Sequence, residues 1–112
     1  MPTFRSGQVL LLTVPYTDGT PGKKRPAVVL ADTGDADVIV ARVTSQPGDG
    51  EYDVTLADWR KAALLAPSVV RVNKMATLSK DMVERELGTL SPSDWVLISE
   101  KLRQLFAAVQ TK

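Results

Sequence analysis

Short apolar segments separated by turn-forming residues make up most of this chain. Several segments alternate apolar and polar positions, which is the pattern of a β-strand with one buried face. Others are continuous apolar runs of strand length, which indicate strands buried on both faces. The pattern predicts strands at Gln8–Val14, Arg25–Leu30, Val38–Thr44, Glu51–Leu56, Val69–Leu78 (as one strand or two) and Glu84–Thr89.

Alternation is clearest in the third and fourth of these segments, and it assigns their side chains to faces. Within Val38–Thr44 one face carries Ile39, Ala41 and Val43, and the other carries Val40, Arg42 and Thr44. Within Glu51–Leu56 the inward positions are Tyr52, Val54 and Leu56, and the outward positions are Glu51, Asp53 and Thr55.

Turn signals lie between the strands. Pro15–Lys24 is rich in Pro and Gly, and it is long for a hairpin loop, which is often a sign of function. Asp32–Asp37 and Pro47–Gly50 are predicted turns, and Ser79–Val83 is predicted to form one helical turn. Asp58–Ala66 fits either a short helical turn or a loop with apolar anchors.

The end of the chain predicts a helix from about Pro92 to Val109. Ser91 suits the N-cap, because its hydroxyl can accept a backbone N–H of the first turn, and Pro92 suits the first helical position. Apolar residues then recur at helical spacing, which predicts one packed stripe. The stripe consists of Trp95, Ile98, Leu102, Leu105 and Val109.

Several short strands followed by one helix predict a mostly-β fold, a small antiparallel barrel with a C-terminal α-helix. The strands are too closely spaced for βαβ crossovers. The 112 residues, with neither repeats nor linkers, predict a single domain spanning 1–112.

Composition restricts the available chemistry. The chain has no Cys and no His, which excludes thiolate catalysis and removes the commonest general base and metal ligand. Its acidic residues are scattered, so a carboxylate metal cluster is not expected, and we expect no cofactor. The net charge is only +1, so any nucleic-acid site must be a local basic patch. Without a secretory pattern or a membrane-length apolar run, we expect a cytoplasmic protein with no membrane partner.

Three groups of residues are candidates for binding or catalysis. Lys23, Lys24 and Arg25 concentrate positive charge where a loop meets a strand, and a guanidinium fork suits phosphate oxygens. Thr44 ends a strand and could offer a hydroxyl to a phosphate. Arg71 and Asn73 share a strand face and could bind phosphates or base edges. Each group also has a structural interpretation, as a solvated charge cluster, an ordinary strand threonine and a solvated strand face.

These segments, in this order and spacing, resemble the MazF/PemK/Kid family of toxin endoribonucleases from toxin–antitoxin modules. The resemblance spans about Gly7 to Phe106. It rests on Gly7-Gln-Val, Lys24-Arg-Pro-Ala-Val-Val-Leu30, Val38-Ile-Val…Val43-Thr-Ser45, Pro67-Ser-Val-Val-Arg71 and Leu87-Gly-Thr-Leu-Ser-Pro92.

The resemblance implies an SH3-like barrel, a homodimer, and metal-independent, sequence-specific cleavage of single-stranded RNA. It also implies a cognate antitoxin whose tail blocks the RNA groove. Arg25 matches the position of the family's catalytic arginine, and Thr44 matches that of its catalytic hydroxyl. Arg71 falls where the Kid branch has a catalytic arginine. We expect Lys23, Lys24, Ser45, Arg71 and Asn73 to bind RNA.

The chain also departs from the family pattern. Asn73 stands where the Kid branch has an Asp, and Pro15–Lys24 lacks that branch's His. Ala76-Thr-Leu-Ser-Lys80 replaces a common Arg-Thr-Ile-Asp-Lys stretch. These differences favour a scheme built on Arg25 and Thr44, in which the RNA 2′-OH attacks the phosphate to give a 2′,3′-cyclic phosphate and a 5′-OH. They leave open an inactive relative that acts by binding protein, either as a gyrase poison or as an SH3-like adaptor.

Overall fold

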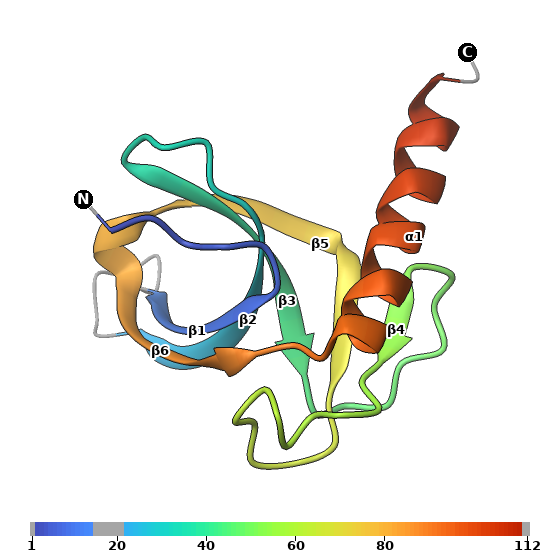
Figure 1. Cartoon of the computed structure of the whole chain (residues 1–112), viewed down its shortest axis with the longest axis horizontal. Coiled ribbons are helices and arrows are strands. Elements are labelled where there is room, and N and C mark those ends of the chain that lie inside the picture. Colours follow the sequence, from blue (N-terminus) through green and yellow to red (C-terminus); the bar gives the residue numbers. More distant parts are fainter. Residues whose placement is uncertain (1, 15–21, 111–112) are drawn as a thin grey trace.

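The described part of the chain forms six β-strands and one long helix, as the sequence pattern predicts (Figure 1). The computed structural model describes residues 2–14 and 22–110, so most of the Pro15–Lys24 turn lies outside the described residues. The elements are β1 (Gln8–Val14), β2 (Lys23–Ala31), β3 (Asp37–Thr44), β4 (Asp53–Thr55), β5 (Val69–Ser79), the 3-10 turn η1 (Lys80–Met82), β6 (Val83–Thr89) and α1 (Pro92–Gln110).

The strands form one antiparallel sheet in the order β4-β5-β3-β2-β1-β6. The sheet curls strongly, with η1 carrying the chain from β5 across to β6 (Figure 1). Its edge strands β4 and β6 do not pair with each other in the described residues, so the barrel-like sheet is open. The prediction of a mostly-β fold with a C-terminal helix is confirmed.

Two hydrophobic clusters explain the continuous apolar runs of the inner strands. Neighbouring residues of β2 enter different clusters, because successive side chains of a strand point to opposite faces: Val28 packs in the larger cluster and Val29 in the smaller. The larger cluster also receives Ile98 of α1, and the smaller one receives Phe4 from the N-terminal segment. Both faces of the central strands are therefore buried.

The sheet divides at one end, between β2 and β3. The pairing of these two strands ends at Ala27 and Arg42. Beyond that point β2 continues along β1 as far as Lys23, and β3 continues along β5 as far as Thr44. The last residues of β2 and β3 consequently diverge, and a gap opens between the two strands.

Helix α1 begins as predicted. The backbone N–H of Asp94 donates to the Ser91 hydroxyl at 3.2 Å, and Ile98 is fully buried against the sheet. The predicted stripe is wrong at its end, because Val109 is 68% exposed. The helix packs against β4 and β5, and its C-terminal half extends beyond the sheet (Figure 1). No helix in the described part of the chain is long and apolar enough to cross a membrane.

Two segments in the middle of the chain refine the predictions made from the sequence. The fourth strand is only three residues long, and the side chain of Asp53, predicted to point outward, is 4% exposed. Asp53 is buried because it accepts the Gly50 N–H and faces Arg71 across the strand pair. The segment 58–66 is a loop of turns anchored by the buried Ala62 and Leu64. Of the two predicted alternatives, the loop with apolar anchors is therefore the one observed.

Candidate functional site

A pocket of about 560 Å³ occupies the opening between the ends of β2 and β3. Leu11, Pro26 and Val43 contribute apolar surface from three adjacent strands. The loop residues Ala63–Ala66 line it from another side, and Leu65 among them is fully exposed. The pocket therefore combines an apolar lining with polar residues at the ends of the strands.

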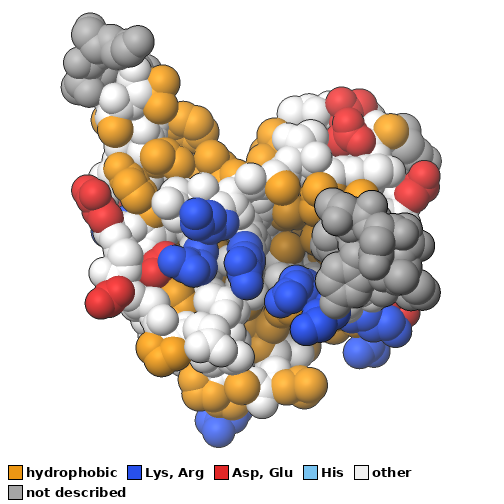
Figure 2. Space-filling view, turned by 180° about the vertical axis from the view of Figure 1, so that it is seen from behind, with side chains coloured by type: hydrophobic (Ala, Val, Ile, Leu, Met, Phe, Trp, Pro, Cys, Tyr) orange, Lys and Arg blue, Asp and Glu red, His pale blue; other side chains and the backbone are white. Residues whose placement is uncertain are grey.

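Basic side chains dominate the charge of this pocket. Lys24, Arg25, Arg42 and Arg85 line it, whereas none of the described residues in its lining is Asp or Glu. Figure 2 shows Lys and Arg side chains gathered across the middle of one face, with hydrophobic side chains between them. A chain with a net charge of +1 thus has a local cluster of positively charged side chains, which is suited to an anionic ligand.

Arg25 is placed in the pocket by β2, where it pairs with Leu12 of β1. Its side chain is exposed, and within the described residues it forms no ion pair. An exposed guanidinium beside an apolar surface retains all its donors for a ligand. The structure brings Arg25 to the same pocket as Thr44, its predicted catalytic partner.

Thr44 is half-buried at the end of β3. Its Oγ1 accepts the backbone N–H of Gln46 at 3.1 Å, which fixes the position of the oxygen. A hydroxyl that accepts one hydrogen bond still has its own O–H to donate. Thr44 can therefore donate to a phosphate oxygen, and Ser45 lines the pocket beside it.

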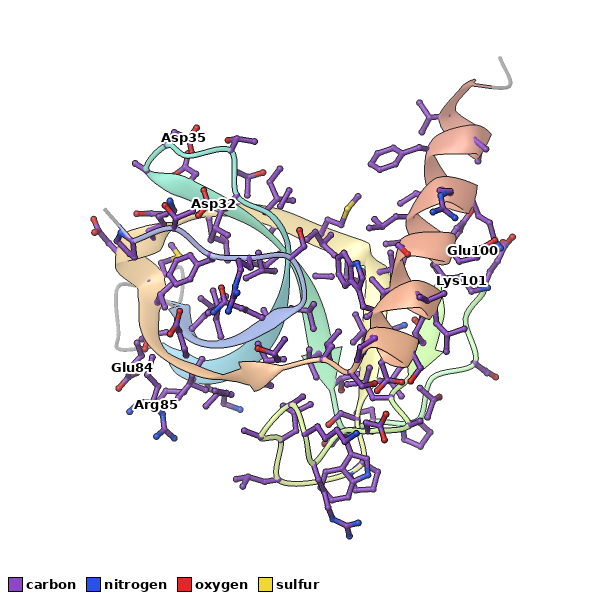
Figure 3. All side chains as sticks on the ribbon, viewed as in Figure 1. Asp32, Asp35, Glu84, Arg85, Glu100 and Lys101 are labelled. Carbon is purple, nitrogen blue, oxygen red and sulfur yellow. The ribbon has the colours of Figure 1, made fainter. Side chains whose placement is uncertain are left out.

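Lys24 lines the pocket, but Glu84 partly neutralises it. Its Nζ lies 2.7 Å from Glu84 Oε1, and the Thr13 hydroxyl donates to Glu84 Oε2 at 2.7 Å. The hydrogen bonds from Lys24 and then Thr13 lower the pKa of the Glu84 carboxyl. Figure 3 shows Glu84 and its neighbour Arg85 on β6, the strand that borders this end of the pocket.

The remaining predicted RNA-binding residues lie outside the pocket lining. Lys23 is exposed at the start of β2, next to the pocket residue Lys24. Asn73 is exposed on β5, where the pairing with β3 is irregular. Arg71 pairs with Arg42 in the sheet, so it lies one strand away from the pocket.

Two basic residues of the pocket, Arg42 and Arg85, were not predicted from the sequence. A signal for Arg42 was present, because the alternation of Val38–Thr44 places Arg42 and Thr44 on one strand face. No comparable signal marked Arg85, which reaches the pocket only because β6 pairs with β1. The described residues include no group of three His, Cys, Asp or Glu side chains able to hold a metal ion.

Comparisons with known proteins agree with this fold. Residues 5–106 match the family model described as "PemK-like, MazF-like toxin of type II toxin-antitoxin system". None of the curated proteins searched matches the chain.

Several solved structures share the fold at low sequence identity. A MazE–MazF crystal structure from Deinococcus radiodurans is 20% identical, with a TM-score of 0.78 over 95% of this chain and 98% of that one. A mycobacterial endoribonuclease in complex with its cognate antitoxin is 21% identical, with a TM-score of 0.75 over 96% of each chain. A second structure named as a mycobacterial endoribonuclease is 20% identical, with a TM-score of 0.75 over 96% of this chain and 94% of that one. The chain belongs to the family of PemK-like, MazF-like toxins of type II toxin–antitoxin systems.

Proposed function

We propose that this toxin cleaves single-stranded RNA in the cytoplasm at specific sequences, without a metal ion or other cofactor. The observation that carries the proposal is the pocket where Arg25 and Thr44 meet two further arginines and a lysine, with no carboxylate among the lining residues that the structure describes. Its family and the similar structures named as endoribonucleases support the same activity.

The reaction uses a nucleophile that RNA itself carries. The 2′-oxygen next to the scissile phosphate forms a bond to phosphorus and loses its proton, while the bond from phosphorus to the 5′-oxygen breaks. The 5′-oxygen leaves as a hydroxyl, and the other product ends in a 2′,3′-cyclic phosphate. A protein can accelerate this step by aligning the groups and by stabilising the charge that develops on the phosphate.

Arg25 and Thr44 are the proposed catalytic residues. The exposed Arg25 guanidinium stabilises the additional negative charge on the phosphate oxygens, since its fork of donors fits them in two places at once. Thr44 donates its hydroxyl hydrogen to one of these oxygens. Its position is fixed by the Gln46 N–H, so no ordering of the side chain is needed at the moment of reaction.

The substrate is held by residues around the catalytic pair. Lys23, Lys24, Ser45, Arg71 and Asn73 are proposed to bind RNA along the ends of β2, β3 and β5. The apolar part of the pocket, including the exposed Leu65, offers a surface for a nucleobase. The phosphate contacts give affinity, whereas contacts with bases select the sequence that is cut.

We further propose that the toxin is a homodimer and binds a cognate antitoxin. The support is that α1 exposes several large apolar side chains: Val96, Leu97, Phe106 and Val109 are each more than half exposed. Exposed large apolar side chains of this kind are typical of protein–protein contact surfaces. Light scattering of the purified toxin should give twice the mass of one 12.1 kDa chain.

Mapping RNA ends tests the proposed activity. Purified toxin is incubated with a pool of single-stranded RNA, and the cleaved ends are sequenced. We expect defined 5′-hydroxyl ends, which Arg25→Ala abolishes, because loss of a donor to a transition-state oxyanion costs about 100-fold or more in rate. The matched control is Arg103→Ala, which removes an exposed arginine from α1 that pairs with Glu100.

Three outcomes decide the proposal. Cleavage by Arg25→Ala at the wild-type rate would refute the central role of Arg25. Strong inhibition by excess chelator would refute metal independence. Growth arrest on expression, with intact RNA, would favour the alternative in which the protein acts by binding another protein.

A further inference from the structure

Arg42 and Arg71 lie directly opposite each other on the paired strands β3 and β5. Opposed residues of an antiparallel pair have their side chains on the same face, with Cβ atoms about 5 Å apart. Thr44, two residues along β3, shares this face. The sheet therefore aligns two guanidinium groups beside the proposed catalytic hydroxyl.

Arg71 forms an ion pair with the buried carboxylate of Asp53. The two residues pair between β4 and β5, with Arg71 Nε 3.5 Å from Asp53 Oδ1. The Asp53 side chain is 4% exposed, and its Oδ2 accepts the Gly50 N–H at 3.1 Å. Arg71 Nε is buried without a hydrogen bond to the described residues, while the side chain as a whole is 39% exposed. The Nε end of the guanidinium is thus buried beside Asp53, and the rest of the side chain is accessible.

The charges at this position are unbalanced. Asp53 faces Arg71, whereas Arg42 is exposed and forms no ion pair within the described residues. Like charges directly opposite each other on neighbouring strands destabilise a sheet. An anion bound between the two guanidinium groups would remove this repulsion and would supply acceptors for both.

We propose that Arg42 and Arg71 bind a phosphate of the RNA adjacent to the scissile one, and that Asp53 positions Arg71 for this contact. This inference rests on the proposed function. Arg42 and Thr44 are two residues apart on one strand, about 7 Å, a spacing comparable to that of successive phosphates in a single strand. Asp53 is a positioning residue, because its buried carboxylate does not line the pocket.

Salt-dependent binding of a non-cleavable RNA tests the inference. The probe is an RNA that the wild-type toxin cuts, with a 2′-deoxynucleotide at the cleavage position. For Arg42→Gln we expect about tenfold weaker binding, because a charge-assisted hydrogen bond is lost. The slope of log K against log salt should also fall by about 0.7, the value for one phosphate contact in a single strand. Arg103→Gln, the matched control, should keep the wild-type Kd and slope.

A double-mutant cycle tests the role of Asp53. Asp53→Asn should weaken binding of the same probe in the wild-type background, but should have no further effect in an Arg71→Gln background. A merely structural role of Asp53 would instead weaken binding equally in both backgrounds, and that result would overturn the positioning role. Urea unfolding of each variant shows that the proteins compared are folded.

The outcomes separate this inference from the proposed function. If the wild-type toxin cuts RNA but Arg42→Gln binds the probe with wild-type Kd and slope, the second phosphate contact is wrong and the nuclease proposal stands. If the wild-type toxin neither binds nor cuts RNA, both are overturned.

Discussion

Asp94 connects the first turn of α1 to the loop that lines the pocket. Its Oδ1 accepts the N–H of Ala57 at 3.0 Å and its Oδ2 accepts the N–H of Asp58 at 2.9 Å. Asp94 is 1% exposed, so water cannot easily replace either bond. We predict that Asp94→Ala destabilises the protein and loosens this loop.

The magnitude follows from the number of bonds lost. A hydrogen bond to a charged group contributes about 1.5–3 kcal/mol, so two of them correspond to about 3–6 kcal/mol. Ala57 is exposed, so its freed N–H can bind water and thereby recover part of this free energy. We therefore expect the free energy of unfolding to fall by about 3 kcal/mol. A domain has about 5–15 kcal/mol in total, so the loss is large but leaves a folded protein.

Urea denaturation measures this loss as a shift in midpoint at unchanged m-value. The matched control is Ser99→Ala on the same helix, where the hydroxyl bonds only to its own helix and the change should stay within about 0.5 kcal/mol. A loss below about 1 kcal/mol for Asp94→Ala would show that the two loop bonds are not important for stability.

Two further predictions concern other parts of the fold. A Cβ on Gly88 of β6 would lie 2.7 Å from the carbonyl carbon of Ala62. Gly88→Ala should therefore lower the free energy of unfolding in urea by about 1–3 kcal/mol and reduce RNA cleavage, because it displaces the loop that lines the pocket. Unchanged stability and cleavage would contradict the close packing. The backbone N–H groups of Phe4 and Gly34, and then Lys80, lower the pKa of Asp32 from 3.8 to about 2. Because the folded-state pKa is the lower one, this stabilisation is complete above pH 3.8 and is lost as the pH falls towards 2. Urea midpoints of Asp32→Asn should therefore fall less over this range than those of the wild type, and parallel curves would contradict the assignment.

Most of the fold could be read from local pattern. Alternation and apolar runs located the strands because burial repeats every two residues along a strand. Ser91 and Pro92 marked the start of α1 because a helix begins with unpaired N–H groups that need an acceptor. The charge cluster ending at Arg25, together with the segment ending at Thr44, pointed to two residues that the structure places in one pocket.

Other features depend on contacts between distant segments. Asp53 alternates like an outward residue, yet it is buried because Arg71 and Gly50 satisfy its carboxylate. Lys80 reads as a surface residue, but it is 8% exposed and its Nζ lies 3.0 Å from Oδ2 of Asp32, in the turn that follows β2 (Figure 3). Such burial cannot be inferred from one segment, because the partner that offsets the cost of desolvation lies elsewhere in the chain.

The sequence by itself determined the strands, the helix and the two residues at the centre of the proposed site. Only the tertiary structure decided where the sheet divides, and this division opens the pocket between Arg25 and Thr44. It also decided that Arg42 faces Arg71. The physical reason is that strand formation depends on short-range periodicity, whereas strand register and the packing of loops depend on contacts between segments far apart in the chain.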